Sequence, residues 1–479
     1  MNTKMIKYIL AKMVLMEGLL MMLPALVGLV YKESISFIYI FVGLSLCLFG
    51  YTWGYSKPKN TRIFAKEGFV IVALSWVILS IFGAMPFYIT REIPSYIDAF
   101  FETVSGFTTT GSTIINDIEA LSRSSMFWRS FSHWIGGMGI LVFVVAFLPQ
   151  SSGNTLHILQ AEMPGPIVGK LTSKIKVTAR LLYIIYAALT ILEMILLFLG
   201  GMNFFDCVVN SFSTAGTGGF GIWNNSIAYY DSAYIDSVIT IFMALFGINF
   251  NLIYFLLIGK FAAALKSEEL RWYLGIILGA TLLISINVLP LYKSIFQAFR
   301  YASFTVVSII TTTGFITADY QQWPLFSKTI IVSLMFIGAM AGSTGGGIKV
   351  SRIMMYIKKS LSELKKLVHP HSVSTVKFEG EVVHEKTITQ IHTYLVLYAM
   401  VFIVSLLLIS LQNIDYASAF TAVTTCINNV GPGLNVVGPV ENFSSLTNLS
   451  KLVLCFDMLA GRLEIFPILL LFSKDLWVD

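Results

Sequence analysis

Charged residues are scarce in this chain: Asp, Glu, Lys and Arg together make up 12% of its 479 residues. Soluble domains carry about 25% charged residues. Hydrophobic residues make up 56% of the sequence, and its mean hydropathy is +0.78. This composition excludes an ordinary soluble domain and indicates a polytopic membrane protein, so the length does not translate into a number of globular domains.

Cysteine and histidine are also scarce, with four and six residues respectively. The cysteines stand in apolar sequence without the spacing of zinc ligands, and we interpret them as buried small hydrophobic residues. They are Cys47, Cys207, Cys426 and Cys455. A membrane-embedded acyl or glycosyl transferase would need acids, histidines or metal ligands clustered near a membrane face, and the sequence has no such cluster. It therefore predicts neither an enzyme nor a bound cofactor.

Long apolar runs fill most of the chain. Ten of them reach the roughly 20 residues that a membrane-spanning helix needs. They lie near residues 7–30, 34–55, 67–89, 127–149, 177–200, 233–259, 272–291, 326–357, 389–411 and 446–473. Basic residues gather between these runs, around Lys57, Lys174, Lys266 and Lys358. By the positive-inside rule these loops and both termini are cytoplasmic. Since membrane-length runs separate the basic clusters, we expect no nucleic-acid partner.

Four shorter apolar segments alternate with the long runs, near residues 97–109, 205–216, 298–312 and 416–428. Each is about half a membrane long and leads into a stretch rich in small residues. A unit of span, half-helix, extended loop and span is thus repeated four times. We expect Asp98, Asp206 and Asp415 to cap three of the half-helices. Asp98 and Glu102 are also candidates for attracting cations at the outer mouth.

The four small-residue stretches are the candidate site. Backbone rich in Gly and Thr is tolerated at membrane depth only where it is buried or lines a water-filled path. Four such loops favour a ring of backbone carbonyls around a cation, with the carbonyl ends of the half-helices pointing at it. The alternative, four hairpins that merely turn the chain, does not explain the shared half-helices. The candidate cation-binding residues are Thr109, Thr110, Gly111, Thr217, Gly218, Gly219, Thr312, Thr313, Gly314, Asn429, Val430 and Gly431.

Two polar features interrupt the later spans. The glycines 345–347 predict a break in the span near 326–357, because consecutive glycines do not hold a regular helix well. This break is either a packing kink or a flexible loop that obstructs permeation. Arg462 falls in the last span, where an arginine is costly and faces a cavity or a partner. It is either half of an ion pair with another segment, Glu464 being poorly placed for it, or a positive charge in the path. Asn249 is interpreted as a packing residue that can hydrogen-bond to a neighbouring helix.

The repeated plan and its motifs resemble the Trk/Ktr/HKT superfamily of potassium transporters. The motifs are residues 105–111, 217–220, 428–433 and 461–466, and the resemblance runs from about residue 60 to the end. The extra amino-terminal pair of spans is similar to the TrkH branch rather than the shorter KtrB branch. The implied fold is an all-α polytopic membrane protein with four span–half-helix–span repeats around one pore, preceded by two extra transmembrane helices. The expected units are residues 1–60 (the helix pair), 61–150, 151–265, 266–375 and 376–479.

The resemblance implies potassium uptake through a gated, channel-like pore, with potassium as the substrate. In the superfamily a glycine in the first filter loop goes with potassium selectivity and a serine with sodium preference, so Gly111 favours potassium. A sodium-dependent potassium system of the Ktr kind, or a sodium transporter of the same fold, is the open alternative. A secondary transporter with inverted repeats would show two related halves instead of four similar units.

The resemblance also implies the gate and the assembly. In the superfamily the third repeat carries a gating loop, and the last span of the chain carries an arginine in the permeation path. The corresponding residues are Gly342, Ser343, Thr344, Gly345, Gly346, Gly347 and Arg462. The implied assembly is a homodimer surrounded by lipid in the inner membrane, regulated by a cytosolic nucleotide-binding ring of the TrkA kind. Residues 342–349 lack the Gly-Lys-Ser/Thr ending of a phosphate-binding loop, so nucleotide sensing is expected in that partner.

Overall fold

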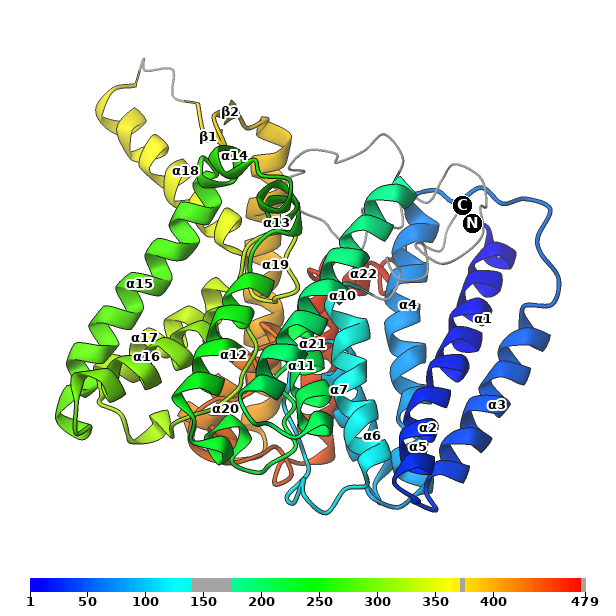
Figure 1. Ribbon diagram of the computed structural model, residues 1–479. Coiled ribbons are helices and arrows are strands. Elements are labelled where there is room, and N and C mark those ends of the chain that lie inside the picture. The colour runs from blue at the N-terminus through cyan, green and yellow to red at the C-terminus, as the bar shows by residue number, and fades with distance from the viewer. Residues whose placement is uncertain (140–174, 371–374, 475–479) are drawn as a thin grey trace.

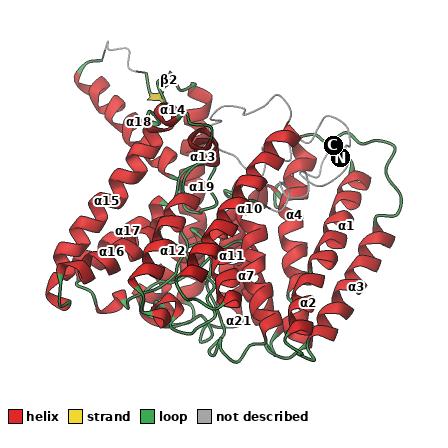
Figure 2. Ribbon diagram, viewed as in Figure 1, coloured by secondary structure: helices red, strands yellow, loops and turns green. Residues whose placement is uncertain are grey.

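The computed structural model describes residues 1–139, 175–370 and 375–474, and their regular structure is almost entirely helical (Figures 1 and 2). Within these residues the only strands are β1 (Lys377–Phe378) and β2 (Glu381–Val382), which form one antiparallel hairpin. Short 3-10 helices are η1 (Ser226–Tyr230), η2 (Leu289–Leu291), η3 (Tyr320–Gln322) and η4 (Asn435–Val437). The end of the span expected near 127–149 and the basic residues Lys170 and Lys174 lie outside the described residues.

Among the described residues, six of the predicted spans are helices long and apolar enough to cross a membrane. They are α1 (Thr3–Leu20) with α2 (Met22–Val30), α3 (Ser36–Trp53), α4 (Ala65–Gly83) with α5 (Met85–Ile89), α10 (Ile175–Leu199), α15 (Glu268–Val288) and α19 (Glu385–Ser410). These are the amino-terminal pair and the first span of each repeat. The fold class predicted from the sequence, four repeats preceded by two extra helices, is confirmed.

The second spans of the second, third and fourth repeats are interrupted, which the sequence indicated only for the third repeat. The second spans are α7 (Arg123–Gly137), α12 (Ala233–Phe246) with α13 (Phe250–Leu257), α17 (Leu325–Ile337) with α18 (Val350–Val368), and α21 (Asn448–Arg462) with α22 (Phe466–Leu470). The pair α12 and α13 is bent by 107°. Continuous spans near 233–259 and 446–473 are therefore wrong, and Arg462 ends a helix instead of lying inside one. A short helix, α14 (Phe261–Leu265), follows α13.

The four half-helices are present at the predicted places. They are α6 (Tyr96–Phe107), α11 (Phe204–Gly216), α16 (Ile295–Ile310) and α20 (Tyr416–Ile427). Asp415 caps α20 as predicted, through its side chain and the Ser418 N–H. The capping predictions for Asp98 and Asp206 are wrong, because α6 and α11 begin three positions earlier, after Ser95 and Asn203. Both aspartates instead lie in the first helical turn, where negative charge still complements the helix dipole.

Each half-helix ends against a second span, and glycine allows the close approach. A Cβ added to Gly136 of α7 would lie 1.8 Å from the carbonyl oxygen of Phe107, the last residue of α6. A Cβ on Gly461 of α21 would lie 1.9 Å from the carbonyl oxygen of Ile427, the last residue of α20. Any side chain at these glycines would push the end of the half-helix away from the second span.

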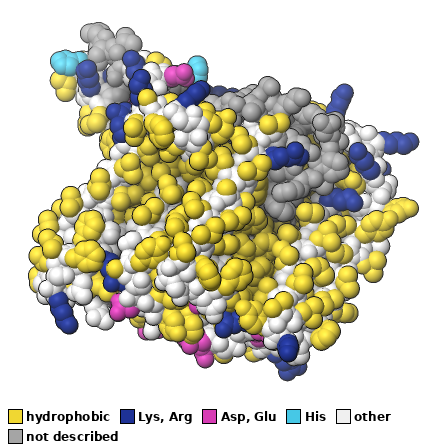
Figure 3. All heavy atoms as spheres, viewed as in Figure 1, with side chains coloured by type: hydrophobic (Ala, Val, Ile, Leu, Met, Phe, Trp, Pro, Cys, Tyr) yellow, Lys and Arg dark blue, Asp and Glu magenta, His cyan; other side chains and the backbone are white. Residues whose placement is uncertain are grey.

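Charge divides the molecule into two edges separated by an apolar belt (Figure 3). The chain start, the β1–β2 hairpin and the end of α18 share one edge, over which most Lys and Arg gather; we call it the basic edge. The half-helices begin at the opposite edge, called here the half-helix edge, where Asp and Glu are visible. Exposed apolar side chains of α3 and α15, such as Phe41 and Leu282, cover the zone between. This distribution is that of a multi-pass membrane protein.

Candidate functional site

The four small-residue loops share one backbone conformation. Four non-glycine residues, one per loop, have left-handed φ angles: Thr109 (55°), Thr217 (54°), Thr312 (60°) and Asn429 (54°). Two positions further on, each loop has a left-handed glycine: Gly111 (80°), Gly219 (76°), Gly314 (81°) and Gly431 (101°). Positive φ is uncommon outside glycine. Its recurrence at equivalent positions therefore identifies the loops as four copies of one element.

The amide hydrogens of the loops turn back toward their own half-helices. The residue between the two left-handed positions donates to a carbonyl five residues earlier in every loop. The bonds are Thr110 N to Ser105 O (2.9 Å), Gly218 N to Ser213 O (2.9 Å), Thr313 N to Ser308 O (2.8 Å) and Val430 N to Thr425 O (2.9 Å). Within the described part of the chain, no hydrogen-bond donor reaches the carbonyl oxygens of Thr110, Gly218, Thr313 or Val430. These oxygens, called here the carbonyl ring, are available to a cation.

The loops close on one another in chain order. We call the left-handed glycines of the four loops the filter glycines. A Cβ added to any of them would collide with the ring carbonyl oxygen of the following loop, and the loop that follows the fourth is the first. The distances from the added Cβ to that oxygen are 2.0 Å for Gly111 to Gly218, 2.0 Å for Gly219 to Thr313, 2.3 Å for Gly314 to Val430 and 2.8 Å for Gly431 to Thr110. The ring is closed, and glycine is required at each junction by both φ and space.

A cavity of about 110 Å³ opens from the ring toward the half-helix edge. All four filter glycines line it, together with polar residues of the outer loops such as Asn116, Asn224 and Asn442. Its volume corresponds to roughly four water molecules. The cavity is thus a small vestibule lined by polar residues on one side of the ring.

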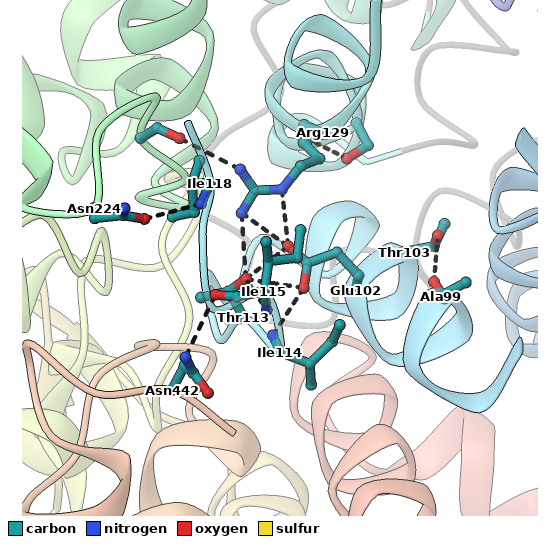
Figure 4. Close-up of polar contacts among 12 residues, drawn as sticks. Ala99, Glu102, Thr103, Thr113, Ile114, Ile115, Ile118, Arg129, Asn224 and Asn442 are labelled. Atoms are coloured by element: carbon teal, nitrogen blue, oxygen red, sulfur yellow. Dashed lines mark hydrogen bonds and ion pairs between the residues drawn. The ribbon is translucent and has the colours of Figure 1, made fainter. Parts of the chain in front are cut away.

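A buried ion pair supports the first two loops from behind (Figure 4). Arg129 of α7 lies 2.8 Å from the Glu102 carboxylate of α6, and both side chains are almost fully buried. Glu102 also accepts hydrogen bonds from the Thr113 hydroxyl and the Ile114 N–H, both at 3.0 Å. The Arg129 guanidinium lies 4.1 Å from the ring centroid of Phe220, which directly follows the second loop. The pair thus connects the first loop to the second.

This pairing corrects the interpretation of Glu102 as a cation-attracting residue of the mouth. Its side chain is inaccessible, and its charge is compensated by Arg129. Asp98 also has a partner, since Lys451 of α21 lies 2.6 Å from its carboxylate. Neither carboxylate offers a free negative charge to the vestibule.

The chain that follows the first loop is held from two sides (Figure 4). The Ile118 N–H donates to the Asn224 side chain of the second repeat (2.9 Å). The Asn442 side chain of the fourth repeat donates to the Ile115 carbonyl (3.4 Å). Outer loops of three repeats are therefore joined around the vestibule.

Residues 338–349 between α17 and α18, called here the intramembrane segment, lie on the other side of the ring. The Gly346 N–H donates to the Thr312 hydroxyl (2.6 Å). A Cβ on Gly345 would lie 2.8 Å from the Thr311 carbonyl oxygen, and one on Gly346 would lie 2.4 Å from that of Asn428. The segment therefore packs directly against the third and fourth loops.

The bend between α12 and α13 holds this segment. Met340 N donates to Gly247 O (3.1 Å), and Phe250 N donates to Gly342 O (3.1 Å). The Asn249 side chain donates to the Ala341 carbonyl at 2.7 Å. The interpretation of Asn249 as a packing residue was thus incomplete. Asn249, a polar residue in an otherwise apolar run, is the sequence feature that could have indicated this bend.

Arg462 joins the intramembrane segment to α7. Its guanidinium donates to the Thr344 carbonyl (2.8 Å) and to the Gly137 carbonyl (2.7 Å), and it also contacts the Gly136 carbonyl. Glu464 pairs with Arg352 of α18, in agreement with the expectation that it does not pair with Arg462. The structure thus places the twelve predicted loop residues in the four loops that meet at the carbonyl ring, and the seven predicted gating residues in the intramembrane segment or, for Arg462, in contact with it. Sequence reasoning missed the pairing of Glu102 with Arg129 and the α12–α13 bend.

Fold and site together define a multi-pass membrane transport protein, and comparisons with known proteins agree. The TrkH family model, described as a cation transport protein, matches residues 35–478. The chain belongs to this family.

Several relatives cover nearly the whole chain. The Trk system potassium uptake protein TrkH of Salmonella typhimurium is 38% identical over 95% of both chains. The TrkG protein of Escherichia coli is 33% identical over 97% of this chain and 96% of its own. The crystal structure of the potassium transporter TrkH from Vibrio parahaemolyticus matches with a TM-score of 0.89 and 34% identity, covering 100% of both chains.

Proposed function

We propose that this chain takes up potassium across the cell membrane through the carbonyl ring. The cyclic contact of the four loops carries this proposal, because it sets around one centre backbone oxygens from four repeats that accept no hydrogen bond from the described residues. Such a ring replaces the hydration shell of a cation. The carbonyl ends of the four half-helices add partial negative charge. Transport needs no covalent chemistry, so the protein is not an enzyme and potassium is its substrate.

Potassium, as opposed to cations in general, is supported by the relatives and by the first loop. TrkH of Salmonella typhimurium and TrkG of Escherichia coli are both named potassium uptake proteins. Gly111 stands where the superfamily resemblance associates glycine with potassium. Its left-handed φ and its contact with the Gly218 carbonyl leave no room for serine without displacing the ring.

The intramembrane segment is proposed as the gate. It lies against the loops on the side away from the vestibule, and Arg462 adds a positive charge there. A cation that leaves the ring would meet both. Opening then requires the segment to move and its bonds to Arg462 and to the α12–α13 bend to break.

Arg462→Ala, or deletion of residues 345–347, should raise potassium flux into proteoliposomes without any partner. Loss of hydrogen bonds from a charged group corresponds to about a tenfold shift of a gating equilibrium. Arg462→Lys keeps the charge and serves as the matched control. If neither the alanine variant nor the deletion conducts more than the parent, the gate lies elsewhere.

The proposed setting is the inner membrane, with the basic edge in the cytoplasm. There a cytosolic nucleotide-binding ring of the TrkA kind would regulate a homodimer of this chain. The deciding experiment is growth rescue of a potassium-uptake-deficient strain at low external potassium, with and without such a ring. Rescue supports the proposal. Failure with both proteins well expressed contradicts it, and dominant sodium flux would favour a sodium transporter of the same fold.

A further inference from the structure

Glu269 at the start of α15 contacts both ends of the intramembrane segment. Its side chain is buried, with 2% exposure. One carboxylate oxygen, Oε1, accepts hydrogen bonds from the Ala341 N–H (2.8 Å) and the Ser351 N–H (3.2 Å). Ala341 lies near the beginning of the segment, and Ser351 lies in the first turn of α18, just after its end. This oxygen thus bridges the two ends, which are also joined by the backbone bonds Lys349 N to Ile337 O (3.0 Å) and Val350 N to Ala339 O (3.1 Å).

The segment contains strained backbone that its surroundings must hold. Gly338, Gly342 and Gly347 have φ angles of 74°, 74° and 78°, and the non-glycine Lys349 has a φ of 83°. A strained non-glycine residue persists only where its surroundings hold it. The carboxylate also faces the amino-terminal end of α18, where free N–H groups and the helix dipole favour negative charge.

Glu269 is itself held by the β1–β2 hairpin at the basic edge. Glu379, in the turn of this hairpin, accepts hydrogen bonds from the Glu268 N–H (3.0 Å) and the Glu269 N–H (3.2 Å). It also accepts one from the Ser267 hydroxyl at 2.8 Å. Glu379 thereby caps α15 from outside the helix.

The hairpin is tied to α18 as well. Lys358 of α18 lies 2.5 Å from the Glu268 carboxylate. It also donates to the Lys377 carbonyl of β1 (2.8 Å). The hairpin, the start of α15 and the helix after the segment therefore form one connected group.

We propose that Glu269 is the positioning residue that holds the intramembrane segment against the carbonyl ring, and that the hairpin controls it through Glu379. A displacement of the hairpin at the basic edge would move the start of α15 and withdraw the carboxylate from Ala341 and Ser351. This inference rests on the proposed gating function of the segment and adds the contact through which a cytosolic partner would act.

The test compares partner-free potassium flux into proteoliposomes for Glu269→Ala, Glu269→Gln and Glu379→Ala. The alanine variant removes the shared acceptor, and we expect flux to rise on the order of tenfold. The glutamine variant keeps an amide oxygen that can accept both bonds, and it should stay within about threefold of the parent. Glu379→Ala should raise flux to a level between the two. The potassium/sodium flux ratio should not change, because the ring is intact.

Two further variants make the outcome decisive. Glu363→Gln removes an exposed carboxylate of α18 that pairs only locally with Lys359 and Lys366 among the described residues, and its flux should equal that of the parent. Deletion of residues 345–347 tests the gate itself. If the deletion raises flux and Glu269→Ala does not, the role of Glu269 is wrong and the gate stands. If the deletion also leaves flux unchanged, the proposed gate fails.

A second readout separates positioning from a folding defect. Ser343→Cys in the segment should react faster with a membrane-impermeant thiol reagent when combined with Glu269→Ala, against the background of the four native cysteines. An unchanged rate overturns the proposal. If Glu269→Ala does not fold, Glu379→Ala at the more exposed hairpin decides, and parental flux in that variant overturns the proposal.

Discussion

At the scale of single residues, the charged side chains that support the loops are buried. Glu102 and Arg129 compensate each other behind the first two loops, and each also contacts the chain next to a loop. Breaking a buried pair by removing one partner leaves an uncompensated charge, which costs about 3–5 kcal/mol. The pair therefore sets loop position as well as stability.

Arg129→Met should lower the unfolding temperature and the potassium/sodium flux ratio, because Glu102 loses its counter-charge and Thr113 its fixed support. The double variant Glu102→Gln with Arg129→Met removes both charges and should lie closer to the parent than the single variant. Thermal unfolding in detergent and ion flux in proteoliposomes measure the two effects. Parental stability and selectivity in Arg129→Met would contradict the supporting role.

At the scale of elements, the first and second spans of the repeats differ in how their sequence determines them. A first span such as α19 is one uninterrupted apolar run, and hydropathy alone predicted it. The second spans break where distant segments approach: Asn249 bonds to a carbonyl 92 residues away. Such breaks depend on tertiary contacts, so local pattern predicted only the one marked by three glycines.

Asn249→Leu should loosen the intramembrane segment. The substitution removes the bond to the Ala341 carbonyl and the side-chain cap of α13. Two neutral hydrogen bonds at about 1 kcal/mol each correspond to a rise in partner-free flux of roughly thirtyfold. Ser237→Ala is the matched control, since its hydroxyl bonds only within α12 among the described residues. Equal flux in the two variants would show that the bend does not hold the segment.

At the scale of the whole molecule, four copies of one unit make a site that none of them makes alone. The sequence predicted the units and the loop residues, because glycine and threonine at membrane depth are rare enough to be informative. It did not predict the order in which the loops touch, since each junction pairs residues from different repeats. It also placed helix caps at Asp98 and Asp206, because an aspartate inside a first turn and one at a cap look alike in sequence.

We propose that the transported cation passes through the carbonyl ring. The most direct measurement is the potassium/sodium flux ratio of Gly111→Ser in proteoliposomes. The matched control is Gly201→Ser, which has a similar left-handed φ of 86° but no neighbour within 4 Å of an added Cβ. We expect a ratio about tenfold lower for Gly111→Ser, equivalent to about 1.4 kcal/mol, and a parental ratio for Gly201→Ser. A parental ratio in Gly111→Ser would contradict the proposal.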